Sequence, residues 1–97
     1  MRVYDRRLRW SVPRWLPARI AGRTVDAIDR RSKYLLFRCS GDTLLVHFGM
    51  TGSLRAFLNP PPRRSHDHVD IVLDSGVTLR YHDPRRFGAM LWLPPPA

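Results

Sequence analysis

The chain has 97 residues, 43% of them hydrophobic, so it forms one small domain with a limited core. Its 17 basic and 8 acidic residues give a net charge of +9, which predicts a polyanionic partner, most often nucleic acid. The sequence has no apolar run as long as a membrane span and no second cysteine for an internal disulfide. Because MRVYDRRLRW has no apolar stretch, we expect no secretory signal.

The first predicted elements are short. A weak alternation over residues 1–10 predicts a strand that ends near Trp10. A helical turn is predicted over residues 17–21, because Pro17 can begin a helix and Gly22 is a stop signal.

From Arg23 onward the sequence alternates with a period of two, which is typical of strands. The short β-rich runs are TVDAIDR, KYLLFRC, TLLVHF, SLRAF, DHVDIVLD, VTLRYHD and FGAMLW. SGD and Ser75-Gly76 are hairpin-type turns between neighbouring runs. In DHVDIVLD the apolar side chains share one face and the aspartates the other: Val69, Ile71 and Leu73 against Asp70 and Asp74.

This spacing predicts a mainly β fold, an antiparallel β-sandwich or flattened barrel with at most one short helix. We expect the domain to span residues 1–93, with a polar and basic loop at the prolines 60–62. Residues 94–97 are expected to begin a proline-rich linker.

Lys33 is the only lysine, and it follows Arg30 and Arg31 at the start of a strand. This cluster is either a solvated basic rim or a phosphate-binding site whose amine could move protons. His47 ends the run TLLVH, and its role has two similar interpretations. It is either a half-buried structural histidine or a donor to a phosphate.

His66 and His68 lie on the same side of an extended chain, and with His47 and His82 they raise the question of a zinc site. Their spacing fits no known zinc signature and only one thiol is present, so we expect no metal site.

Two turns have bulky side chains where small ones are usual. Met50 stands between two glycines in VHFGMTGS, where either a neighbouring sheet covers it or it enters another molecule. In DPRRFG, Arg85 and Phe87 point the same way if the segment is extended. An arginine beside an exposed ring suits a loop that reads base edges and wedges between base steps, although Phe87 could also be a core residue.

These motifs occur together in one order: RRSKYLLF, VHFGMTGSLR, HDHVDIVL and LRYHDPRRFGAMLW. Over about residues 7–92 the chain resembles the N-terminal domain of bacterial formamidopyrimidine-DNA glycosylase. The resemblance implies base-excision repair, in which an oxidised purine is flipped out of duplex DNA.

The resemblance also implies roles for single residues. Met50, Arg85 and Phe87 match the trio that fills the vacated space, with Phe87 as the wedge and Arg85 bonded to the orphaned cytosine. Lys33 and His47 match residues that hold phosphates around the flipped nucleotide. Lys33 further matches the proton donor of strand cleavage, and His66, like Arg85, matches a DNA contact.

The sequence departs from the family at both ends. The family's nucleophile is an N-terminal proline followed by a glutamate, whereas this chain begins MRVYDRRLRW and contains no glutamate. The family's C-terminal helix-two-turns-helix and zinc-finger domain is not matched, so no cofactor is expected here. We therefore expect a family domain without its first helix and strand.

The expected partner is damaged double-stranded DNA, bound by a monomer in the bacterial cytoplasm at the nucleoid, with no membrane involved. Binding is expected to be weak and salt-sensitive, with little or no glycosylase or lyase turnover. Two alternatives stay open. One is a non-catalytic module that recognises damaged DNA, and the other is a small basic RNA-associated β protein.

Overall fold

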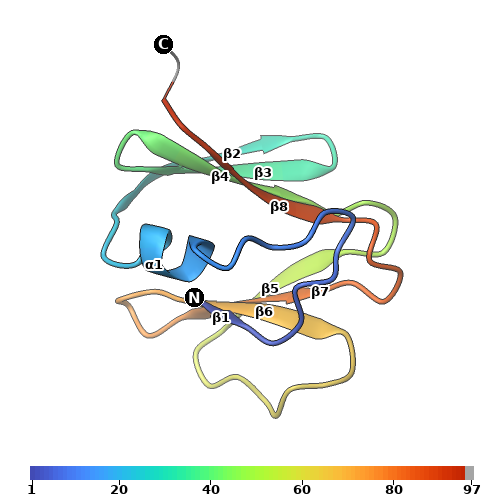
Figure 1. Cartoon of the computed structure of the whole chain (residues 1–97). Coiled ribbons are helices and arrows are strands. Elements are labelled where there is room, and N and C mark those ends of the chain that lie inside the picture. The colour runs from blue at the N-terminus through green and yellow to red at the C-terminus, as the bar shows by residue number, and fades with distance from the viewer. Residues whose placement is uncertain (96–97) are drawn as a thin grey trace.

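A computed structural model describes residues 1–95. The chain forms two four-stranded antiparallel sheets packed face to face with one short helix between them (Figure 1). The elements in chain order are β1 Arg2–Val3, α1 Leu16–Ile20, β2 Val25–Arg31, β3 Tyr34–Cys39, β4 Asp42–His47, β5 Ser53–Phe57, β6 Asp67–Val72, β7 Thr78–His82 and β8 Ala89–Leu93. The predicted β-sandwich with one short helix is confirmed.

Each sheet takes strands from distant parts of the chain. One sheet has the order β1-β6-β7-β5 and the other the order β2-β3-β4-β8. The turn between β3 and β4 consists of Ser40 and Gly41, both at positive φ, as a two-residue hairpin turn requires. The β2–β3 register shifts between Val25 and Ala27, so the run TVDAIDR does not alternate regularly along its whole length.

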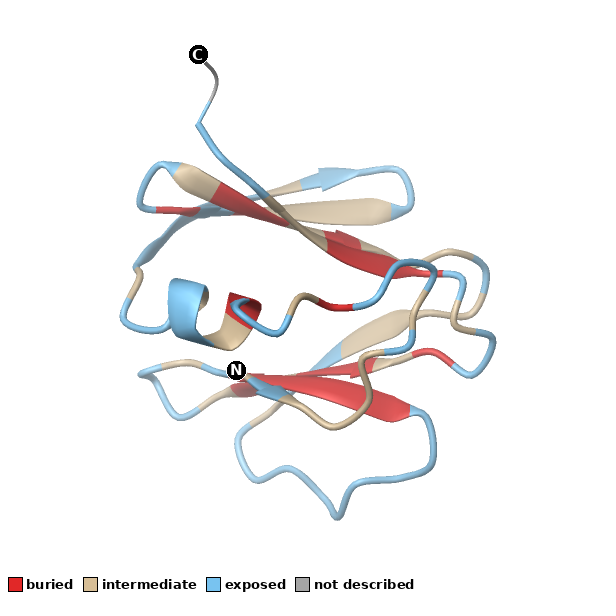
Figure 2. Ribbon diagram, viewed as in Figure 1, coloured by how far each residue is buried: buried red, intermediate tan, exposed pale blue. Residues whose placement is uncertain are grey.

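The core lies between the two sheets, where buried residues line both inner faces (Figure 2). Val69, Ile71 and Tyr81 contribute from one sheet, and Leu44 and Val46 from the other. Val12 and Leu16 are also fully buried, so the segment before α1 and the helix itself close one side of the sandwich. No helix among residues 1–95 is both long and apolar enough to cross a membrane.

One prediction needs correction. The strand expected to end near Trp10 ends at Val3. The amides of Tyr4 and Asp5 both donate to the carbonyl of His68, where β6 is irregular, and the chain then leaves the sheet. The predicted linker at 94–97 falls partly outside the described residues, which end at Pro95.

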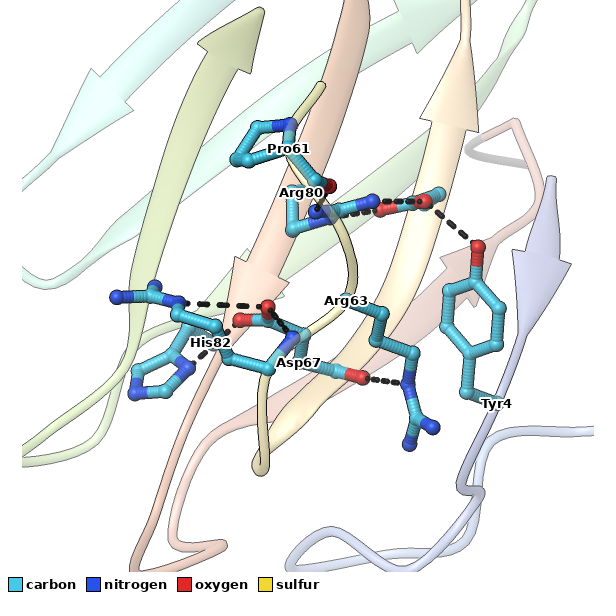
Figure 3. A network of polar contacts seen from close by, with 8 residues as sticks. Tyr4, Pro61, Arg63, Asp67, Arg80 and His82 are labelled. Carbon is cyan, nitrogen blue, oxygen red and sulfur yellow. Dashed lines mark hydrogen bonds and ion pairs between the residues drawn. The ribbon is translucent and has the colours of Figure 1, made fainter.

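Asp70 is on the outer face of its sheet, as predicted, but it is buried there. Its carboxylate accepts two hydrogen bonds from Arg80, at 2.8 and 3.0 Å, and one from the hydroxyl of Tyr4 at 2.8 Å (Figure 3). Arg80 also donates to the carbonyl of Pro61 at 2.7 Å, which fastens the 58–66 loop over this face.

Candidate nucleic-acid interface

The two unusual turns lie side by side at one end of the sandwich, opposite α1 (Figure 1). Residues 48–52 lead from β4 into β5, and residues 83–88 lead from β7 into β8. Both connections therefore pass from one sheet to the other. The strand pairs His47–Ala89 and Ser53–His82 place the starts and ends of the two turns next to each other.

A buried carboxylate joins the two turns. Asp83 is completely buried, and its oxygens accept hydrogen bonds from the Thr51 hydroxyl at 2.8 Å and the Gly88 amide at 2.8 Å. The amide of Arg86 donates to the same carboxylate at 3.1 Å. Because Thr51 belongs to the first turn and Gly88 to the second, Asp83 fixes their relative position.

Tyr81 lies beneath this junction. Its hydroxyl is within hydrogen-bond distance of the Asp83 carboxylate, at 2.9 Å, and of the His47 carbonyl, at 3.1 Å. Burial is the main reason that the pKa of Tyr81 is raised, and the negative charge of Asp83 raises it further. The hydroxyl therefore keeps its proton, and stays a donor, at any pH near neutral.

The junction is too crowded for a side chain at Gly49 or Gly88. A methyl group at Gly49 would lie 2.7 Å from the carbonyl carbon of Phe87 and 2.8 Å from the amide nitrogen of Gly88. At Gly88 it would collide with the Tyr81 hydroxyl and the His47 carbonyl. The glycines thus let the backbones of the two turns touch.

The three bulky side chains of these turns face solvent. Met50 is 71% exposed and Phe87 is 45% exposed, and the Arg85 guanidinium lies 4.9 Å from the centre of the Phe87 ring. Neither a sheet nor the core covers Met50 or Phe87, so the alternative of a core role for Phe87 is wrong.

Lys33 and His47 border the same end. The β2–β3 hairpin turns at Ser32 and Lys33, and the Lys33 carbonyl accepts a hydrogen bond from the Phe48 amide at 2.9 Å. The Nδ1 atom of His47 accepts from the Gly49 amide at 3.0 Å, so a neutral His47 ring has its proton on Nε2. His47 is half-buried, and its Nε2–H remains a donor for an oxygen ligand.

His66 reaches this end from the other sheet. Its carbonyl accepts a hydrogen bond from the Asp83 amide at 3.1 Å, and its side chain is exposed. It lines a small polar pocket of about 270 Å³, in which basic side chains outnumber the acidic one. The pocket is lined by Asp5, Arg63, Arg64, Ser65, His66, His68 and Arg86.

The other two histidines of this region have structural partners. His68 is buried and its Nε2 lies 2.9 Å from the Asp83 carbonyl, and the Nδ1 of His82 lies 2.7 Å from the Asp67 carboxylate (Figure 3). Burial alone would raise the pKa of Asp67, but hydrogen bonds from the Arg64 amide and from His82 outweigh it and lower the pKa. Within residues 1–95 no three histidine, cysteine or acidic side chains are arranged to hold a metal ion.

All six predicted site residues thus lie on segments that meet at one end of the sandwich. The sequence did not indicate the residues that hold these segments together, namely Asp83, Thr51 and Tyr81. Asp83-Pro84 signals a turn, but no local pattern shows that the carboxylate of Asp83 is buried under a second turn that is 32 residues away at Thr51.

The protein-family model of the formamidopyrimidine-DNA glycosylase N-terminal domain matches residues 1–90. The chain belongs to this family. The formamidopyrimidine-DNA glycosylase of Stutzerimonas stutzeri is 57% identical over 90 residues, covering 93% of this chain and 33% of the relative. That of Hahella chejuensis is 54% identical over 94 residues, covering 97% of this chain and 35% of the relative. The resemblance inferred from the motifs is confirmed.

Solved structures of the family share the fold. Lactococcus lactis formamidopyrimidine-DNA glycosylase, bound non-covalently to DNA containing an AP site, matches with a TM-score of 0.82 and 28% identity, over 96% of this chain and 35% of that one. MutM in complex with DNA containing carbocyclic 8-oxo-G matches with a TM-score of 0.73 and 31% identity, over 81% of this chain and 30% of that one. The chain therefore spans about a third of the length of these relatives.

Proposed function

We propose that the two joined turns form a wedge that enters damaged double-stranded DNA. The proposal depends on one observation, the exposure of Met50, Arg85 and Phe87 on turns that Asp83 and Thr51 lock together. Exposed apolar side chains normally cost a protein solubility, so a rigid pair of them beside an arginine favours a role in binding.

Each side chain suits a different part of a disrupted base stack. The Phe87 ring is flat and apolar, so it can wedge between base steps. Met50 is flexible and can fill the irregular gap that a flipped nucleotide leaves. Arg85 offers paired donors to the edge of the base that has lost its partner.

The phosphates around this gap would be held by Lys33, His47 and His66. These residues lie on three separate segments around the turns, and each offers a donor or a positive charge to a phosphate oxygen. With a net charge of +9, the chain favours a duplex over a neutral ligand. We infer binding as a monomer, in the bacterial cytoplasm at the nucleoid.

For the whole protein we propose the family's activity, a DNA glycosylase with AP lyase activity that excises oxidised purines in base-excision repair. Lys33 has the chain's only side-chain amine and is the proposed proton donor of the lyase step. The 97-residue chain alone has no glutamate, and the aspartates at this end, Asp5, Asp67 and Asp83, are taken up by hydrogen bonds. We therefore expect it to bind DNA with little or no turnover.

Binding to a fluorescent duplex containing a tetrahydrofuran abasic analogue tests this proposal. We expect tighter binding to this duplex than to the intact one. Met50→Ala or Phe87→Ala should reduce the ratio of the two affinities about tenfold, since a side chain packed against a base contributes roughly 1–3 kcal/mol. Leu58→Ala is a matched control, because Leu58 is 72% exposed but follows the far end of β5.

Equal affinity of the wild-type chain for both duplexes would contradict the proposal. Equal effects of Met50→Ala and Leu58→Ala would show that surface hydrophobicity, and not the position of the turn, determines binding. A preference for RNA that is insensitive to Phe87→Ala would favour the RNA-associated alternative.

A further inference from the structure

The segment between β1 and α1 runs along the outer side of the 83–88 turn. The Arg9 amide donates to the Gly88 carbonyl at 3.0 Å, and the Arg86 guanidinium donates to the Arg7 carbonyl at 2.7 Å and to the Asp5 carboxylate at 2.9 Å. Residues 5–9 are therefore attached to the same turn that presents Arg85 and Phe87.

This segment is also fixed internally. Asp5 accepts three hydrogen bonds from Arg7, at 2.9 to 3.1 Å, and these bonds, together with the one from Arg86, lower the pKa of Asp5 well below its ordinary range. On the other side, the Val12 amide donates to the Arg6 carbonyl at 2.9 Å and the Val12 side chain is buried in the core. Residues 9–11 form a short bridge between two anchored points.

Trp10 projects from this bridge. It is 55% exposed, and the Arg9 guanidinium lies 5.0 Å from the centre of its indole ring. An indole has the largest side-chain surface, and here more than half of it stays exposed although the segment that carries it is anchored. Its neighbour Arg9 adds a positive charge beside the Phe87 turn.

We propose that Trp10 and Arg9 form a second contact with the duplex, next to the wedge. The indole would cover the sugar or base face of a nucleotide that flanks the gap, and Arg9 would bind the adjoining phosphate. This inference rests on the proposed function, because it requires a duplex already lying across Phe87. The contact extends the bound stretch of DNA beyond the flipped nucleotide.

Affinity of the 97-residue chain for the abasic-analogue duplex tests the contact. Trp10→Ala is expected to weaken binding about 5- to 20-fold, the range of one lost stacking contact. Trp15→Ala is the matched control. Trp15 is 50% exposed and has its own arginine, Arg19, at 5.4 Å, but it is the N-cap residue of α1, the helix that lies opposite the two turns in Figure 1. Its effect is expected to stay within about twofold, as for a surface residue without a ligand.

A second measurement detects the contact without a truncated side chain. The duplex is expected to quench the tryptophan emission of the wild type. Trp10→Phe should abolish most of this quenching, whereas Trp15→Phe should preserve it. Circular dichroism melting of each variant confirms that the fold is intact.

The outcomes separate this inference from the proposed function. If Phe87→Ala weakens binding while Trp10→Ala and Trp15→Ala behave alike and quenching persists in Trp10→Phe, the second contact is wrong and the wedge stands. If the wild-type chain does not distinguish the abasic duplex from the intact one, the wedge fails and the contact fails with it.

Discussion

At the scale of single residues, Asp83 has the largest structural effect on the interface. A buried carboxylate is favourable only when several donors compensate for its desolvation, and here they come from Thr51, Gly88, Tyr81 and Arg86. These donors come from both turns, so the bonds that stabilise Asp83 also set the distance between Met50 and Phe87.

Asp83→Asn should therefore destabilise the fold and weaken DNA binding. The amide keeps one acceptor oxygen but replaces the other with a donor that faces donors, so we expect a loss of roughly 2–3 kcal/mol in the free energy of unfolding. Urea titration measures it. Asp74→Asn is the control, because Asp74 is exposed in the β6–β7 turn. Equal stability of the two variants would show that Asp83 does not join the turns.

His68 should make stability depend on pH. Burial lowers its pKa below the ordinary value of 6.5, although the hydrogen bond to the Asp83 carbonyl opposes this shift. The unfolded chain then takes up the proton more readily than the folded one. The stability from the neutral ring is thus fully present above about pH 6.5 and is lost as the pH falls from there toward the folded-state pKa.

His68→Gln should flatten this dependence while keeping an N–H donor for Asp83. Unfolding free energies at about pH 7.5 and pH 5.5 should differ in the wild type and be nearly equal in the variant. The same change at the exposed His66 is the control and should leave the wild-type difference in place. If the unfolding free energy of His68→Gln differed between the two pH values as much as that of the wild type, His68 would be ruled out as the titrating group.

At the scale of elements, the two turns work because their backbones touch. Gly88→Ala places a methyl group against the Tyr81 hydroxyl and the His47 carbonyl, and such overpacking costs about 1–3 kcal/mol. Gly76→Ala is a useful comparison, since Gly76 has a φ of 91° but no atom within 4 Å of the position that a Cβ would take. It should reduce stability through backbone strain alone and leave DNA affinity unchanged, whereas Gly88→Ala should reduce both. Full affinity in a folded Gly88→Ala chain would contradict this.

The local pattern predicted most of these elements. Alternation identified the strands from β3 to β8, and Ser40-Gly41 and Ser75-Gly76 marked their hairpins. The local pattern could not predict that β1 ends at Val3, because an irregularity at His68 in β6 ends the pairing of β1 with β6. It placed Asp70 on the face opposite Val69, but it could not show that Arg80, Tyr4 and the 58–66 loop bury the carboxylate there. These features depend on contacts between distant segments.

In the interface, too, the sequence indicated some residues, whereas others depend on contacts between distant segments. Met50, Arg85 and Phe87 stood out because they break the usual turn chemistry, and their exposure agrees with that signal. Asp83 and Trp10 did not stand out. Aspartate before proline is ordinary in a turn, and the position of Trp10 beside Gly88 depends on a backbone hydrogen bond that no sequence motif marks.

At the scale of the whole molecule, the net charge should control affinity. Because each phosphate contact releases bound counterions, log affinity should fall with log salt by about 0.9 for each contact. Lys33→Ala should reduce this slope by about one, whereas Arg14→Ala, two positions before α1, should change it little. Equal slopes for both variants would place the phosphates elsewhere on the basic surface.

The most direct test of the wedge follows the three methionines of the chain by methyl NMR. Met50 is 71% exposed on its turn, Met90 is buried in the core and Met1 is half-buried near the N-terminus. On addition of the abasic-analogue duplex, the Met50 methyl signal should shift strongly through the ring currents of the bases, while the Met1 and Met90 signals stay in place. A chain that binds the duplex with an unshifted Met50 signal would contradict the insertion of this turn into DNA.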